Sequence, residues 1–264
     1  MLVFWVVYPP VVAALIPIAL GFSGPFSVGS VTSLYREVYT ESWYLIAVLL
    51  ASLAVIFVGQ VLYLLPFRRP PYQGGPGRSM MTTLLLGAGG IAVMVTAAVL
   101  VIAELARRLF IDGRELFGEI GDYWVPFLLA APVLLPAWAV ATPIVIKFCR
   151  GGRREDRAHR LARVLFIGTV VEMMLVLPAD VYVRRKDDCY CATGTYLAMI
   201  GLLFVGLIAL GPVVLMPLIV RRHGRWYASH CSGCGYDMRE MRHERRCPEC
   251  GSDWKTGDPV SAAG

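Results

Sequence analysis

The sequence predicts an all-α membrane protein with about six transmembrane helices, followed by a small β-structured module at the carboxyl end. Two observations predict the helices. The chain is 57% hydrophobic and only 17% charged, and its apolar residues form stretches of about 20, the length that crosses a hydrocarbon core of roughly 30 Å. A third observation, two pairs of closely spaced cysteines near the carboxyl end, predicts the module.

The predicted spans are residues 2–22, 43–65, 82–103, 124–146, 164–181 and 196–220. The first span is the least secure, because Pro9, Pro10 and Pro17 each lack a backbone donor that lipid cannot replace. A five-span protein and a cleaved signal peptide are the alternatives. No Lys or Arg precedes this apolar run, which favours its retention in the protein.

The positions of Lys and Arg predict the orientation, because cations in short loops stay on the cytoplasmic face during insertion. The loop between the fourth and fifth spans carries Lys147, Arg150, Arg153, Arg154, Arg157, Arg160 and Arg163. Arg221, Arg222 and Arg225 follow the last span. We therefore expect a multi-pass protein of the bacterial cytoplasmic (inner) membrane, with the carboxyl end in the cytoplasm and the lipid bilayer as the partner of these cations.

The predicted domains follow from these assignments. Residues 1–222 form the transmembrane helical domain, 223–230 a linker, 231–254 the cysteine module and 255–264 a disordered tail.

The module contains Cys231, Cys234, Cys247 and Cys250 in the pattern C-x2-C, twelve residues, C-x2-C. Two residues between cysteines let one tight turn aim both thiolates at a single ion, and four thiolates complete the tetrahedron that zinc prefers. This pattern predicts a structural zinc ribbon with no open coordination position for catalysis. Reduced thiols or two disulfides are the alternatives, and a reducing cytoplasm argues against the disulfides.

The charge of the module predicts its partner. From residue 231 onward there are five cations against six acids, and a zinc ion held by four thiolates adds further negative charge. Nucleic-acid binding depends on neutralising phosphates, so DNA and RNA are unfavourable partners and a protein partner is expected.

Residues 231–251, CSGCGYDMREMRHERRCPECG, resemble the C-x-x-C-G-Y-D-x-R to C-P-x-C-G ribbon carried by uncharacterised bacterial proteins, several of them multi-pass membrane proteins. A second stretch, residues 170–196, is similar to the last two spans of such proteins, in which two cysteines often adjoin. Here Tyr190 separates Cys189 from Cys191. The resemblance implies a zinc ribbon on a membrane protein and no known activity.

Two carboxylates lie within the fifth span. Glu172 is in its middle, where a buried charge is costly unless it is protonated, paired or open to water. Asp180 follows two turns later on a similar face. The two could line a polar path. Alternatively, Glu172 hydrogen-bonds to a neighbouring helix and Asp180 pairs with Arg184.

The loop after this span contains Cys189 and Cys191 next to two aspartates. On the outer face these thiols could form a strained disulfide or hold a soft metal ion. Their state is left open by the sequence.

The chain has no P-loop, Rossmann fingerprint, H-E-x-x-H helix or nucleophile elbow, so no enzyme activity is expected. The first functional hypothesis is a noncatalytic scaffold whose ribbon contacts a protein. The second is a small transporter or channel that uses Glu172 and Asp180. The third is an envelope thiol or metal sensor that uses Cys189 and Cys191 and requires a continuous sixth span.

Overall fold

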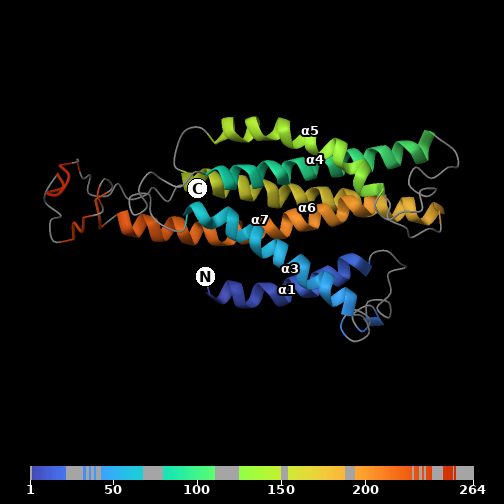
Figure 1. Cartoon of the computed structure of the whole chain (residues 1–264), viewed down its shortest axis with the longest axis horizontal. Helices are drawn as coiled ribbons and strands as arrows, with labels where there is room; N and C mark the ends of the chain where they lie inside the picture. Colours follow the sequence, from blue (N-terminus) through green and yellow to red (C-terminus); the bar gives the residue numbers. More distant parts are fainter. Residues whose placement is uncertain are drawn as a thin grey trace.

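The structure of the chain is a computed structural model. It describes residues 2–21, 32–33, 36, 39, 43–67, 80–110, 125–149, 154–187, 194–227, 229–231, 234, 236–239, 246–251 and 253. Six long α-helices occupy most of these residues (Figure 1): α1 (Leu2–Gly21), α3 (Trp43–Leu64), α4 (Met81–Phe110), α5 (Val125–Phe148), α6 (Arg154–Asp187) and α7 (Gly194–Tyr227). A short 3-10 helix, η2 (Leu65–Phe67), continues α3.

Five of the helical segments are long and apolar enough to cross a membrane, by length and composition. They are Leu45–Phe67, Met81–Phe110, Ala130–Phe148, Asp156–Val183 and Gly194–Arg225. Each overlaps one of the second to sixth predicted spans, so the helical membrane architecture is confirmed for these five. The described residues of α1 contain only a shorter apolar stretch, Phe4–Leu15, so a sixth span is still a prediction.

Three helices form the centre of the bundle. The two longest, α6 and α7, pack along each other, and α4 packs against both. The contact between α4 and α6 is close because Gly87 has no side chain: a Cβ there would lie 2.6 Å from Cδ2 of Leu161. Small residues of this kind let the backbones of membrane helices approach closely.

The other helices lie at the edges of this centre. α5 packs mainly on α4 and contains Pro132, Pro136 and Pro143, and it is visibly bent in Figure 1. Proline removes a helical hydrogen bond and clashes with the preceding turn, so the bend of α5 follows from its sequence. α1 packs on α3 and α7 through a separate apolar cluster that includes Tyr8, Val12 and Ile56.

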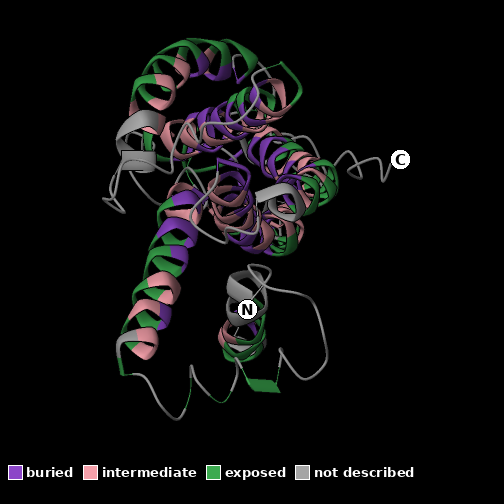
Figure 2. Ribbon diagram, turned by 90° about the vertical axis from the view of Figure 1, so that its right-hand side faces the viewer, coloured by how far each residue is buried: buried purple, intermediate pink, exposed green. Residues whose placement is uncertain are grey.

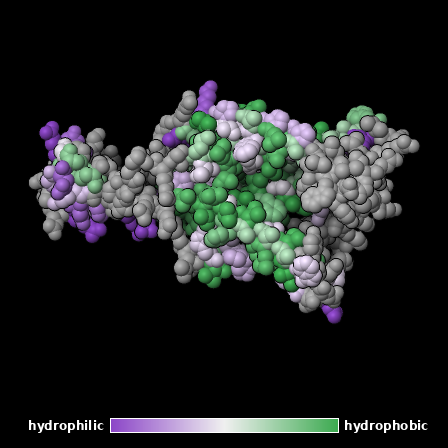
Figure 3. All heavy atoms as spheres, in the orientation of Figure 1, coloured by the Kyte–Doolittle hydropathy of each residue, from purple (hydrophilic) through white to green (hydrophobic). Residues whose placement is uncertain are grey.

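The outer surface of the bundle is apolar. Figure 2 shows the buried residues turned toward the inside and exposed ones on the outside. Large hydrophobic residues such as Phe57, Ile102 and Leu175 are among the exposed ones. Figure 3 shows hydrophobic residues across the middle of one face and hydrophilic residues at the end that carries the carboxyl-terminal cysteines. This distribution matches a protein whose middle is solvated by lipid.

The helices extend past the predicted span ends. α4 reaches Phe110, beyond the predicted end at residue 103, and α7 reaches Tyr227, so that it covers most of the predicted linker. Charged residues such as Arg and Glu are good helix formers, so backbone hydrogen bonding continues after the apolar stretch has ended. Hydropathy alone marks where the lipid ends, not where the helix ends.

Candidate metal centre

Two short turns bring the carboxyl-terminal cysteines together. In the first turn, the amide of Cys231 donates to the carbonyl of Tyr236 at 2.9 Å, and His230 pairs with Asp237 in an isolated β-bridge. In the second, the amide of Gly251 donates to the carbonyl of Cys247 at 2.8 Å. Each turn therefore positions one C-x2-C pair by backbone hydrogen bonds.

Glycine supports the second turn. Gly251 has a φ of 67°, in the left-handed region that residues with a Cβ rarely adopt. The glycine after Cys250 therefore lets the second turn form without backbone strain. The equivalent Gly235 lies outside the described residues.

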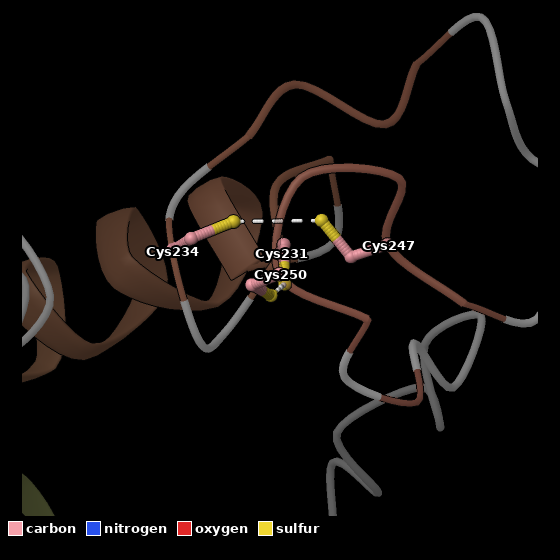
Figure 4. A group of neighbouring side chains, drawn as sticks. All are labelled: Cys231, Cys234, Cys247 and Cys250. Atoms are coloured by element: carbon pink, nitrogen blue, oxygen red, sulfur yellow. Dashed lines mark hydrogen bonds between the residues drawn. The ribbon is translucent and has the colours of Figure 1, made fainter.

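The four sulfur atoms converge on one point (Figure 4). All lie within 4.8 Å of one another, with Cys231 Sγ 3.6 Å from Cys250 Sγ and Cys234 Sγ 3.4 Å from Cys247 Sγ. A tetrahedral ion with metal–sulfur bonds of about 2.3 Å needs sulfur atoms roughly 3.8 Å apart. The residues present therefore fit a metal ion held by four cysteines.

The protein part of this centre is very small. Its buried residues are Cys231, Met238 and Cys247, with Tyr236 packed against them, whereas Cys234 and Cys250 are exposed. The described residues of this region contain isolated β-bridges and no strand, so the predicted β ribbon is not shown. The three buried side chains among the described residues of this centre offset only a small part of the conformational entropy of ordering the module.

The electrostatics of the cluster favour a cation. The backbone amide of Tyr236 lowers the pKa of the Cys234 thiol, whereas desolvation and the thiols of the other three cysteines raise it, to about 12 on balance. Four thiolates at this spacing would repel one another. A bound cation removes that repulsion and stabilises all four as thiolates.

The nearest histidine is engaged elsewhere. His230 Nδ1 lies 2.8 Å from the hydroxyl oxygen of Ser229, and the group of possible ligand atoms contains cysteines alone among the described residues. This agrees with the expectation that four cysteines complete the site.

The two intramembrane carboxylates have different surroundings. Asp180 is buried and accepts a hydrogen bond from the Thr195 hydroxyl, which ties α6 to the first turn of α7. Glu172 is half-buried, and its Oε2 is buried without a hydrogen-bond partner among the described residues. The expected hydrogen bond from Glu172 to a neighbouring helix is therefore not seen at Oε2.

Two predictions around these carboxylates fall outside what the structure describes. The side chain of Arg184, the expected partner of Asp180, is not described. Cys189 and Cys191 also lie outside the described residues, so their pairing stays a prediction.

The structure adds two polar clusters that sequence reasoning missed. At the end of α4, Glu104 is buried and accepts from Arg107 at 2.9 Å, with Arg108 at 3.6 Å. The predicted third span ends at residue 103 and leaves these residues out, but their i, i+3 and i+4 spacing is typical of a continuing helix.

In the second cluster, Tyr8 and Gln60 both donate to the backbone carbonyl of Leu207, Gln60 at 2.9 Å. The buried side chain of Gln60 fills a notch left by Gly211, where a Cβ would lie 2.6 Å from Cδ of Gln60. A single amide inside an apolar stretch was the available signal for Gln60, because such groups bond across helices in lipid.

Comparison of the chain with protein-family models, with curated proteins and with solved structures gives no match.

Proposed function

We propose that this protein is a noncatalytic membrane scaffold whose carboxyl-terminal cysteines hold one structural zinc ion and form a contact site for a protein partner. The convergence of four thiols on one point, directly after a membrane helix, carries the proposal. Zinc is favoured over other metals because it prefers four sulfur ligands in a tetrahedron and is redox-inactive.

The proposed topology has six spans, with α1 as the first, and both chain ends in the cytoplasm of a bacterium. The support is the excess of Lys and Arg at the end of the bundle where α7 leaves it. A reducing cytoplasm keeps the four cysteines available as ligands. The similarity of residues 231–251 to the ribbons of bacterial membrane proteins agrees with this assignment.

The short connection between helix and metal centre explains why the tail would act as a docking site. Three residues separate Tyr227, the last residue of α7, from Cys231. A partner bound there is held at the membrane surface, and its position is fixed by a helix of about 51 Å that crosses the bundle. The zinc ion orders the tail, and α7 holds the tail at the membrane surface.

The test is a crosslinking and affinity-capture experiment with the full-length chain. Cells expressing the protein are compared with cells expressing a Cys247→Ser, Cys250→Ser variant and a Cys149→Ser variant, whose substituted cysteine lies in the helical bundle. We expect a crosslinked protein that is lost in the double variant and kept in the control. Identical crosslinking in all three would contradict the docking function.

A second candidate function is transport of a proton or small cation, favoured by the buried, unpartnered Oε2 of Glu172. Reconstituted vesicles with an imposed pH gradient test it: a Glu172→Gln variant should lose the flux that the unmodified protein shows. Absence of flux in both proteins would contradict transport and favour the scaffold function. The thiol-sensor hypothesis needs a continuous last helix, and α7 is continuous from Gly194 to Tyr227, but its two thiols lie outside the described residues.

A further inference from the structure

Helices α5 and α7 end, and α6 begins, at the end of the bundle that carries the cysteine tail (Figure 1). Cys149, just after α5, packs in one cluster with Leu161 of α6, and Ala158 of α6 packs in another with Ile219 of α7. The carboxyl ends of α5 and α7 therefore meet the amino-terminal turns of α6.

Exposed cations surround this end. We define the basic collar as Lys147 of α5, Arg160 and Arg163 of α6, and Arg221, Arg222 and Arg225 of α7, all of which are exposed. Residues 147–163 and 221–225 together contain ten Lys and Arg but only two acids, Glu155 and Asp156. The collar is thus an uncompensated positive surface.

Each part of the collar continues an apolar stripe that faces lipid. On α5, Lys147 lies one turn from exposed Ile144, which is 60% exposed. On α6, Arg160 and Arg163 lie one turn from Val164 and Ile167. Side chains three or four residues apart share a helix face. The guanidinium groups can therefore extend from the apolar surface toward the headgroup layer.

The same arrangement recurs on α7, where exposed Val214 and Leu218 are followed at helical spacing by Arg222 and Arg225. On all three helices an apolar stripe adjoins a cation. A ligand with an acyl chain and an anionic group matches both parts of this surface.

At the opposite end of the bundle, cations are paired with an acidic residue of the protein. There Arg107 and Arg108 are largely buried against Glu104 and form ion pairs with it. No ion pair joins the five collar arginines to another residue in the part of the chain that the structure describes. The arginines of α4 stabilise the protein internally, whereas those of the collar are available to an external anion.

We propose that the basic collar binds the phosphate groups of anionic phospholipids, whose acyl chains lie along the stripes below it. Guanidinium groups pair with phosphate through two parallel hydrogen bonds, and juxtamembrane cations attract anionic headgroups. Nucleic acid supplies phosphate without an apolar tail, so it would contact the cations of the collar but not the apolar stripes. The proposal does not depend on the metal centre or on the protein partner.

The test is native mass spectrometry of the full-length protein in detergent with an equimolar mixture of phosphatidylglycerol and phosphatidylcholine of identical acyl chains. We expect phosphatidylglycerol adducts to exceed phosphatidylcholine adducts by about fivefold, as several charge-assisted contacts add. An Arg163→Gln, Arg222→Gln variant should bring this ratio close to one. An Arg239→Gln, Arg246→Gln variant makes the same charge change on exposed residues of the tail and should keep the ratio.

Several results would overturn the proposal. One is an equal retention of both lipids by the unmodified protein, and another is an unchanged ratio in the collar variant. If the collar variant fails to fold, the unmodified protein still provides a test, because the ratio must fall as salt screens the collar. A ratio independent of salt between 50 and 500 mM, roughly 14 to 4 Å in screening length, rejects it. Displacement of the lipid by equimolar inorganic phosphate or by a short RNA also rejects it.

Discussion

The helical bundle and the cysteine tail are stabilised by different means. In the bundle, four apolar clusters connect the helices, and hydrogen bonds such as that from Tyr63 to the Ala158 carbonyl, at 2.8 Å, join separate helices. In the described part of the tail, the buried residues are Met238 and two of the four cysteines, Cys231 and Cys247, and a few backbone hydrogen bonds hold the turns. Packing of apolar side chains joins the helices of the bundle, whereas the described tail residues offer little packing and four cysteines that could hold a metal ion.

The largest expected effect is the loss of the metal. A Cys231→Ser, Cys234→Ser variant removes two of four ligands, and a structural zinc ion contributes on the order of 10 kcal/mol to the folding of such a module. Metal analysis should fall from about one ion per chain to near zero, and limited proteolysis should cleave the tail while the helices stay intact.

The matched control is Cys149→Ser, which changes a buried cysteine of the bundle. It should keep the full metal content. A double variant that retains one ion per chain would refute the four-cysteine centre.

A substitution in the bundle should lower the stability of the helices without changing the metal content. Gly211→Ala places a Cβ 2.6 Å from Cδ of Gln60, and overpacking of this kind costs about 1–3 kcal/mol. Thermal unfolding in detergent should shift to lower temperature, with the metal content unchanged. Gly89→Ala is the control, because the nearest atom to its Cβ would be Trp138 Nε1 at 3.8 Å. Equal destabilisation by both substitutions would contradict the packing of α3 on α7.

A smaller effect is expected from acid, which should lower the metal affinity of the tail. The pKa of Cys234 is raised to about 12, above the ordinary value of about 8.5, so this thiol carries a proton at pH 7 without the ion. Metal binding releases that proton, and the apparent affinity therefore falls as the pH falls. Competition with a metal-binding dye between pH 8 and 5 measures the decrease. An affinity that rises in acid would contradict thiolate ligation.

The smallest expected effect concerns a single interhelical hydrogen bond. Tyr8→Phe removes the donor from α1 to the Leu207 carbonyl, and such bonds within membranes contribute about 0.6 kcal/mol. Equilibrium unfolding in mixed detergent should detect a loss of that size. An unchanged unfolding free energy would show that the Tyr8 hydrogen bond does not contribute to holding α1.

The sequence predicted the features that depend on local pattern. Five spans follow from the length of apolar stretches, and the cysteine cluster follows from its spacing. The insertion of Gln60 beside Gly211 depends on how helices far apart in the chain meet. The ion pair of Glu104 with Arg107 is local to α4 and was missed because the predicted span ended at residue 103. Hydropathy reports how apolar a segment is, but not which helix its polar residues face.

The central claim is that one metal ion, held by four cysteine sulfurs, orders the end of a membrane helical bundle. X-ray absorption at the zinc edge, on full-length protein purified in detergent, tests it most directly. The account predicts a first shell of four sulfur atoms at about 2.3 Å. A shell containing nitrogen or oxygen, or a protein purified without any bound metal, would contradict it.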